Sequence, residues 1–124
     1  MSGSRSVLVI DDEPPIRVNL RRILLLEGYS VTEAPDGAAG IECIRHAVPD
    51  LVICDLMMPG VGGYGELEFL RNDAALAGLP FVMLTASAEE EEAETSLARG
   101  ANAYLTKPFS VSALLDVIRG LLPA

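Results

Sequence analysis

Five short apolar runs, separated by segments with helical spacing, constrain the fold of this chain more than any other feature of its sequence. The runs are residues 6–10, 29–34, 51–54, 81–84 and 101–105. Apolar residues at consecutive positions are typical of strands that are buried on both faces of a parallel sheet. The intervening segments, residues 14–28, 38–46, 66–71, 89–99 and 111–122, place apolar residues at helical spacing. This alternation predicts a doubly wound α/β domain with a five-stranded parallel sheet and right-handed crossovers.

Local signals mark several helix boundaries. Pro14 and Pro15 suit the first turn of a helix, where backbone N–H groups have no helical partner. Gly28 is a left-handed cap after the first helix, and Ser110 caps the last one. We interpret the glutamates at 89–92 and 94 as a solvated helix face, whose first turn also favours the helix dipole.

Length and charge limit the domain organisation and the binding partners. The chain has 124 residues, which fits one domain over residues 1–124, with residues 1–5 as a flexible start or a remnant of cloning. A net charge of −9 argues against binding to nucleic acid or to anionic membranes. The apolar runs are too short to cross a bilayer, and no secretory signal is apparent. We therefore expect a cytoplasmic protein in which Cys43 and Cys54 are buried free thiols.

Polar residues follow four of the apolar runs at the point where each strand ends. Asp11 and Asp12 follow the first strand, Asp55 the third, Thr85 the fourth and Lys107 the fifth. In an open parallel sheet, ligands bind beyond the carboxyl ends of the strands, so these side chains should share one crevice. Three carboxylates in one crevice favour a hard divalent cation, and Mg²⁺ is typically held by one or two carboxylates with phosphate and water. A lysine and a hydroxyl beside them suit a phosphoryl group, with a carboxylate as the nucleophile.

With these residues in place, the sequence resembles the receiver domain of two-component response regulators over residues 7–122. Thr85 follows Asp55 by 30 positions and Lys107 follows it by 52, which agrees with the family. The motifs that carry the resemblance are Asp11-Asp12-Glu13-Pro14, Asp55-Leu56-Met57-Met58-Pro59-Gly60, Leu84-Thr85-Ala86 and Tyr104-Leu105-Thr106-Lys107-Pro108-Phe109. The resemblance implies a flavodoxin-like (βα)5 fold with strand order 2-1-3-4-5, an order for which a receiver domain is itself a standard example.

The resemblance also implies the roles of the carboxylates. Asp55 would be the phosphoacceptor, which takes a phosphoryl group from a phosphohistidine and holds it as an acyl phosphate. Asp12 would bind Mg²⁺ directly and Asp11 mainly through water. Asp55 and the backbone carbonyl of Met57 would complete the protein ligands. Self-phosphorylation and slow self-hydrolysis would then be the only reactions, without turnover of a pool of substrate, so the chain is not expected to be an enzyme in the ordinary sense.

The remaining family positions imply a switch. Lys107 would pair with the phosphoryl oxygens, and Thr85 would donate its hydroxyl to another of them. Tyr104 stands at the position of the switch aromatic, although a tyrosine there also fits plain core packing. Ala86 is small and leaves room for the phosphoryl group. The peptide bond between Lys107 and Pro108 is usually cis in this family.

The partners implied are a histidine kinase or a phosphotransfer protein as the phosphoryl donor. Phosphorylation would change the surface formed by the fourth helix, the fifth strand and the fifth helix. A homodimer through the same surface is a further expectation. Direct nucleic acid binding by this domain and membrane binding are not expected.

Two alternative functions remain open at the level of sequence. A receiver-like protein-interaction module that is not phosphorylated would keep the fold without the chemistry. A nucleotide-binding domain would use Gly60, Gly62 and Gly65, which fit a G-x-G-x-x-G pattern between a strand and a helix. Several residues separate Asp55 from Gly60, however, so the tight strand-to-helix turn that this pattern needs is absent.

Overall fold

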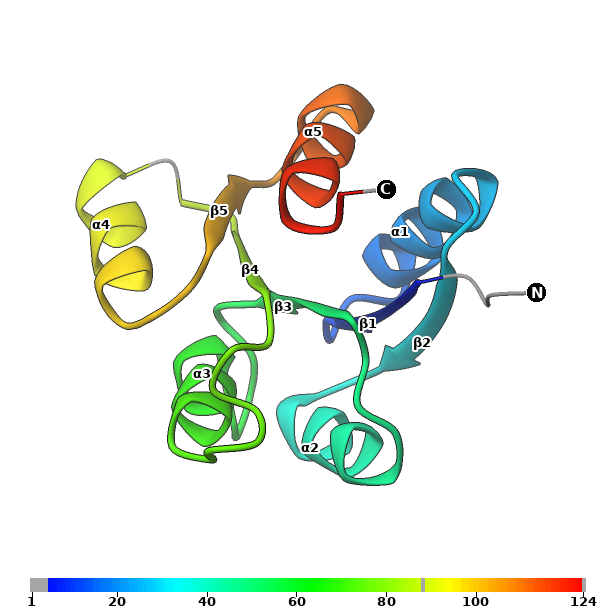
Figure 1. Cartoon of the computed structure of the whole chain (residues 1–124). Helices are drawn as coiled ribbons and strands as arrows, with labels where there is room; N and C mark the ends of the chain where they lie inside the picture. The colour runs from blue at the N-terminus through cyan, green and yellow to red at the C-terminus, as the bar shows by residue number, and fades with distance from the viewer. Residues whose placement is uncertain (1–4, 88, 124) are drawn as a thin grey trace.

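The computed structural model describes residues 5–87 and 89–123, so the sequence prediction for residues 1–4 lies outside the described residues. Five strands alternate with five helices along this part of the chain (Figure 1). The strands are β1 (Ser6–Ile10), β2 (Ser30–Ala34), β3 (Leu51–Asp55), β4 (Phe81–Thr85) and β5 (Ala103–Thr106). The helices are α1 (Pro14–Leu26), α2 (Gly37–His46), α3 (Gly63–Arg71), α4 (Glu90–Ala98) and α5 (Val111–Leu121).

The five strands form one parallel sheet in the order β2-β1-β3-β4-β5. This topology confirms both the α/β fold predicted from the alternation and the strand order implied by the resemblance. The order reverses at β1 and β3, which are neighbours in the sheet although β2 lies between them in the chain. That reversal is the switch point at which ligands bind in doubly wound sheets.

Helices cover both faces of the sheet and bury a separate hydrophobic core on each (Figure 1). On one face, α1 and α5 pack with residues such as Leu24 and Ile118 against Val9 and Ile53. On the other face, α2 and α3 pack against Leu8, Ile10 and Met83. Every residue of β3 and β4 is buried, as the consecutive apolar residues of these strands predict.

The third helix begins at Gly63, three residues before the predicted start at Glu66. The prediction was wrong because Gly63 reads as a loop residue in the sequence, whereas the packing of α3 on β3 requires a glycine there. A Cβ atom at Gly63 would lie 2.5 Å from Met83 Sδ and 2.8 Å from Leu56 Cα. With the helix starting at Gly63, Glu66 falls on the inward face and is fully buried.

The predicted fifth strand also starts too early. The sequence analysis placed its start at Ala101, but the ladder with β4 begins at Ala103. Asn102 precedes the ladder, and it pairs with Phe81 through both its side chain and its backbone: its side chain accepts from the Phe81 backbone N–H at 2.8 Å, and its own backbone N–H donates to the Phe81 carbonyl at 2.8 Å. At the other end, β5 reaches Thr106, so Lys107 follows the strand directly. The other boundaries agree with the predictions within two residues.

Candidate phosphoacceptor site

The carboxyl ends of β1, β3, β4 and β5 bring the predicted site residues to one edge of the sheet. Asp11 and Asp12 follow β1, and Asp55 and Thr85 are the last residues of β3 and β4. The backbone N–H of Lys107 donates to the Thr85 carbonyl at 2.7 Å, which fixes the end of β5 beside β4. Asp11, Asp55 and Thr85 are buried at this edge, where the strands stop and the chain turns into the following loops.

Lys107, the one lysine of the chain, ties the carboxylates together. Its Nζ lies 2.9 Å from Asp11 Oδ2, 3.2 Å from Asp55 Oδ1 and 3.0 Å from Glu13 Oε1. Burial lowers the pKa of Lys107, but hydrogen bonds to Asp11 and Glu13 and the charges of Asp11 and Asp55 outweigh burial and raise it. The ammonium group is therefore charged at any physiological pH. An anionic group bound next to the Asp55 carboxylate would also lie within reach of this positive charge.

Asp55 is held in an environment that disfavours its own charge. Burial, followed by the charge of Asp11, raises the pKa of Asp55 to about 6, and the ammonium group of Lys107 opposes this rise. A carboxyl group with a raised pKa between other carboxylates is typical of a functional site rather than of a surface turn. Near neutral pH the side chain is mostly ionised, which a nucleophilic carboxylate requires.

Four acidic side chains form a cluster that could hold a metal ion. One carboxylate oxygen from each of Asp11, Asp12, Glu13 and Asp55 lies within 4.8 Å of the others. Asp11 Oδ2 is buried and pairs with Lys107 Nζ at 2.9 Å. A buried carboxylate oxygen with spare acceptor capacity, in an all-oxygen donor set, fits a hard divalent cation. The sequence analysis named Asp11, Asp12 and Asp55 but missed Glu13, which stands next in the same motif.

Thr85 and Tyr104 are joined through a residue that the sequence analysis placed on a solvated face. Thr85 Oγ1 donates to Glu92 Oε1 at 2.7 Å, and the hydroxyl of Tyr104 lies 3.1 Å from the same oxygen. The interpretation of Glu92 as a solvated residue was therefore wrong, because α4 packs with this side chain toward the end of β4. No pattern in the glutamate run distinguishes Glu92 from its neighbours, so only the tertiary contact reveals it.

The other predicted positions are placed as follows. The peptide bond between Lys107 and Pro108 is cis. The side chain of Met57 is exposed at 75%, just beyond the end of β3. Ala86 is exposed directly after Thr85. Beside the acidic cluster, an open cavity of about 390 Å³ is lined by Asp12, Asp36 and the loop around Gly60, and of the cluster's carboxylates it exposes that of Asp12.

The glycine-rich loop does not form a nucleotide site. Gly65 lies inside α3 rather than in a turn, and a Cβ atom at Gly62 would lie 2.8 Å from the Leu56 carbonyl oxygen. Gly62 and Gly63 are thus needed for the packing of the chain after β3. The cavity beside this loop is lined by Asp12 and Asp36, without a basic side chain to pair with the phosphates of a nucleotide.

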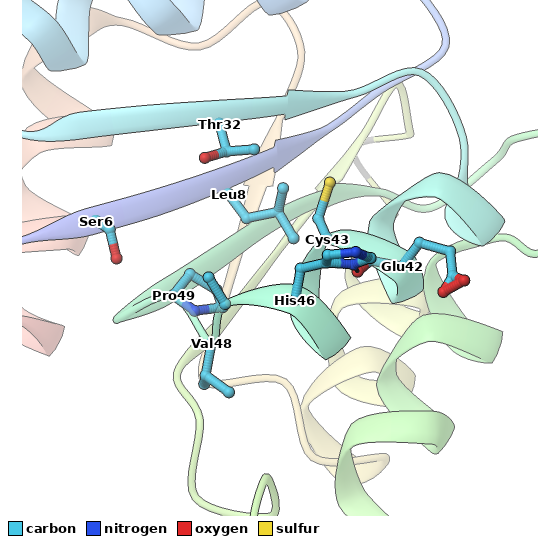
Figure 2. A pocket seen from close by; sticks show the side chains of 9 residues that line it. Ser6, Leu8, Thr32, Glu42, Cys43, His46, Val48 and Pro49 are labelled. Atoms are coloured by element: carbon cyan, nitrogen blue, oxygen red, sulfur yellow. Dashed lines mark hydrogen bonds between the residues drawn. The ribbon is translucent and has the colours of Figure 1, made fainter.

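A second cavity lies at the opposite edge of the sheet, away from the acidic cluster. It measures about 370 Å³ and is lined by residues that include Ser6 at the start of β1 and Pro49 just before β3. Figure 2 shows Cys43 and His46 of α2 beside Leu8 in this cavity. Among the described residues, the only cluster of potential metal ligands is the acidic one at the carboxyl edge.

A doubly wound sheet that presents carboxylates, a hydroxyl and a lysine at its switch point defines a class of α/β domain suited to a metal ion and a phosphoryl group. Comparison with known families narrows this class, because the model of the response regulator receiver domain matches residues 7–119. The chain belongs to this family: it is a receiver domain of a two-component response regulator, and its acidic pocket is consistent with a phosphoacceptor site. Receiver domains of response regulators are not classical enzymes.

Curated relatives are longer than this chain. It is 36% identical over 119 residues to the phosphate regulon transcriptional regulatory protein PhoB of Klebsiella pneumoniae, in a match that covers 96% of this chain and 52% of the relative. It is 38% identical over 117 residues to TcrX of Mycobacterium tuberculosis, which bears the name "probable transcriptional regulatory protein", in a match that covers 94% of this chain and 49% of the relative. The chain spans about half the length of the curated relatives that it matches.

Solved structures of similar length have the same fold. The chemotaxis protein CheY4 of Vibrio cholerae gives a TM-score of 0.89 at 29% identity, covering 96% of this chain and 99% of that one. The receiver domain of the Francisella response regulator 1452 gives 0.88 at 30% identity, covering 95% and 96%. Within the described residues, no helix is long and apolar enough to cross a membrane.

Proposed function

We propose that this domain, as a single receiver domain over residues 1–124, accepts a phosphoryl group on Asp55. The observation that carries the proposal is the position of Lys107, whose Nζ lies within 3.2 Å of carboxylate oxygens of both Asp55 and Asp11 at the switch point of the sheet. A fixed ammonium group beside a reactive carboxylate can neutralise the charge that a phosphoryl group brings. Asp55 is buried, at 4% exposure, and lies next to the exposed carboxylates of Asp12 and Glu13.

The reaction needs one nucleophile and one leaving group. A carboxylate oxygen of Asp55 attacks the phosphorus atom of a phosphohistidine on a histidine kinase or a phosphotransfer protein. The P–O bond to Asp55 forms as the P–N bond breaks, and the imidazole leaves as a neutral group because its other ring nitrogen carries a proton taken from solvent. Lys107 stays protonated throughout and pairs with a phosphoryl oxygen, because its carboxylate partners raise its pKa.

The acidic cluster is the proposed Mg²⁺ site. Asp12 would bind the ion directly and Asp11 through water, with Asp55 and the backbone carbonyl of Met57 as further ligands. The bound ion would neutralise charge on the phosphoryl oxygens. Within the cluster, the Glu13 backbone N–H donates to Asp11 Oδ1 at 2.9 Å, which orients this carboxylate and leaves its other oxygen toward Lys107.

Phosphorylation would be read out at the surface of α4, β5 and α5. In the proposed switch, Thr85 donates its hydroxyl to a phosphoryl oxygen, and Tyr104 responds to the movement of Thr85. The proposal also includes a homodimer through this surface and a cytoplasmic location. This domain would make no direct contact with nucleic acid or with membranes. The net charge of −9 supports the absence of contacts with nucleic acid and with anionic membranes, since both are negatively charged.

Intact mass spectrometry after incubation with Mg²⁺ and acetyl phosphate tests the proposed function. We expect the parent chain to gain the mass of one phosphoryl group and Asp55→Asn to gain none, because an amide is not a nucleophile toward phosphorus under these conditions. Asp50→Asn is a matched control, since Asp50 is exposed and, among the described residues, its carboxylate binds only Ser6 at the far edge of the sheet. Absence of any gain in the parent would favour the interaction module that is not phosphorylated.

Millimolar Mg²⁺ should raise the thermal unfolding temperature. The ion binds only the folded state, where it relieves repulsion among the four carboxylates. A concentration about 100 times the Kd would add about 2.7 kcal/mol of stability. Differential scanning fluorimetry at constant ionic strength measures the shift, and Asp12→Asn should reduce it. A melting temperature that does not depend on Mg²⁺ would contradict the metal site.

A further inference from the structure

A hydrogen-bond network at the end of β4 joins the site to α4. Thr85 Oγ1 donates to Glu92 Oε1 at 2.7 Å and accepts from the Ser87 backbone N–H at 3.1 Å. The hydroxyl of Tyr104 lies 3.1 Å from the same Glu92 oxygen and 2.9 Å from the Ser87 carbonyl oxygen. One carboxylate in the first turn of α4 therefore accepts from Thr85 and shares the single proton of the Tyr104 hydroxyl with the Ser87 carbonyl.

Glu92 and a phosphoryl oxygen on Asp55 would compete for the hydroxyl proton of Thr85. A threonine hydroxyl has one proton to donate. In this structure Thr85 donates that proton to Glu92, so the same proton is not available to a phosphoryl oxygen on Asp55. A hydrogen bond to an ionised carboxylate is about twice as strong as one between neutral groups, so the phosphoryl group must displace a strong acceptor.

We infer that Glu92 is a positioning residue that holds Thr85 in the unphosphorylated arrangement and so opposes formation of the phosphorylated state. The inference rests on the proposed function of Asp55 and Thr85 and deepens it. When Asp55 carries a phosphoryl group, Thr85 exchanges Glu92 for a phosphoryl oxygen as its acceptor. Glu92 then keeps only its contact with the Tyr104 hydroxyl, and the first turn of α4 loses its direct side-chain link to the end of β4.

The position of Glu92 separates it from the other glutamates of α4. Glu90, Glu91 and Glu94 are exposed, and within the described residues their carboxylates accept no hydrogen bond. Glu92 is half-buried, between the end of β4 and Tyr104 of β5. A general effect of negative charge on α4 would be shared by the neighbouring glutamates, whereas the proposed effect belongs to Glu92 alone.

The affinity for beryllofluoride, a tetrahedral analogue of the phosphoryl group, tests this inference at equilibrium. In the presence of Mg²⁺, we expect Glu92→Ala to bind the analogue about tenfold more tightly than the parent, which corresponds to about 1.4 kcal/mol. Glu92→Gln should show a smaller gain, since its amide oxygen still accepts a hydrogen bond without the charge. Glu94→Ala, which removes the same charge from the exposed face, should bind like the parent.

A double-mutant cycle with Thr85→Ala distinguishes positioning of Thr85 from a direct effect of charge. If Glu92 acts through the Thr85 hydroxyl, Glu92→Ala should change the affinity by less than about twofold when Thr85 is already alanine. An equal gain in both backgrounds would overturn the inference. So would an unchanged or weaker affinity in Glu92→Ala and Glu92→Gln, both measured on variants that unfold cooperatively.

Failure of this inference and failure of the proposed function give different results. If the parent and Glu92→Ala both bind beryllofluoride with the same affinity, and Asp55→Asn does not bind it, the phosphoacceptor site stands and the role of Glu92 is excluded. If neither the parent nor Glu92→Ala binds the analogue, both ideas fall together. Amide hydrogen exchange in α4 gives an independent readout: the analogue should speed exchange in the parent, but not in Glu92→Ala, where the link is already absent.

Discussion

Replacing Glu66 with leucine should raise the free energy of unfolding by about 5 kcal/mol at about pH 9. Glu66 is fully buried in α3, and neither of its carboxylate oxygens has a hydrogen-bond partner among the described residues. Burial, followed by the charge of Asp36 at the start of α2, raises the pKa of Glu66 to about 8. Gly40 provides the room for the carboxyl group, since a Cβ atom there would lie 2.8 Å from Glu66 Oε2.

The sign of the effect depends on pH. The ordinary pKa of a glutamate is 4.5, and the folded value is about 8. Below the ordinary value, Glu66 is protonated in both states and its titration does not affect stability. As the pH rises toward 8, the unfolded chain releases the proton while the folded chain keeps it, so the parent loses stability. The titratable groups that interact with this charge are Asp36 and Cys54.

Chemical denaturation between about pH 5 and pH 9 measures this dependence. In Glu66→Gln the free energy of unfolding should no longer fall with pH, because the amide stays neutral. The variant should still be less stable than Glu66→Leu, because the buried amide also lacks hydrogen-bond partners. Glu68→Gln is the matched control, since Glu68 is exposed on the same helix. Parallel pH profiles for the parent and Glu66→Gln would show that Glu66 ionises in the folded state as it does in the unfolded chain.

Lys107→Met should cost about 3 kcal/mol of stability near pH 8 in the absence of Mg²⁺. Among the described residues, Lys107 is the only cationic side chain within 4 Å of the carboxylate oxygens of Asp11 and Asp55. Its loss leaves buried carboxylates without compensation, which is the costly way to break a buried ion pair. The pKa of Asp55, already raised to about 6, should rise further because the charge of Lys107 lowers it in the parent.

This loss should shrink at low pH, because a carboxyl group whose pKa is raised in the folded state destabilises that state only above its ordinary pKa. Unfolding of Lys107→Met should therefore become easier as the pH increases from about 4 to 8. Asp55→Asn in the same chain should restore much of the stability. Arg22→Met, on the exposed face of α1, controls for the removal of one positive charge and should change stability by less than about 0.5 kcal/mol. Equal losses at both pH values would contradict the explanation.

The composition of the site could be predicted from sequence because parallel strands impose it. Asp11, Asp55, Thr85 and Lys107 each follow an apolar run, and parallel strands end at the same edge of a sheet. The direction of the strands is therefore enough to predict that these side chains share one crevice, without knowledge of their distances. The structure adds the distances, and these show that Lys107 bridges Asp55 and Asp11 rather than pointing into solvent.

The sequence by itself determined the alternation of strands and helices, and with it the edge of the sheet at which the polar residues meet. Both follow from local patterns, because hydrophobic periodicity and strand direction are properties of short segments. Only the tertiary structure decided the roles of Glu66 and Glu92. Each is a glutamate in a helix, and its environment depends on what the helix packs against: α2 and the sheet for Glu66, and the ends of β4 and β5 for Glu92. A contact between elements distant in the chain leaves no periodic signal, so burial and hydrogen bonding distinguished these two residues from the other glutamates.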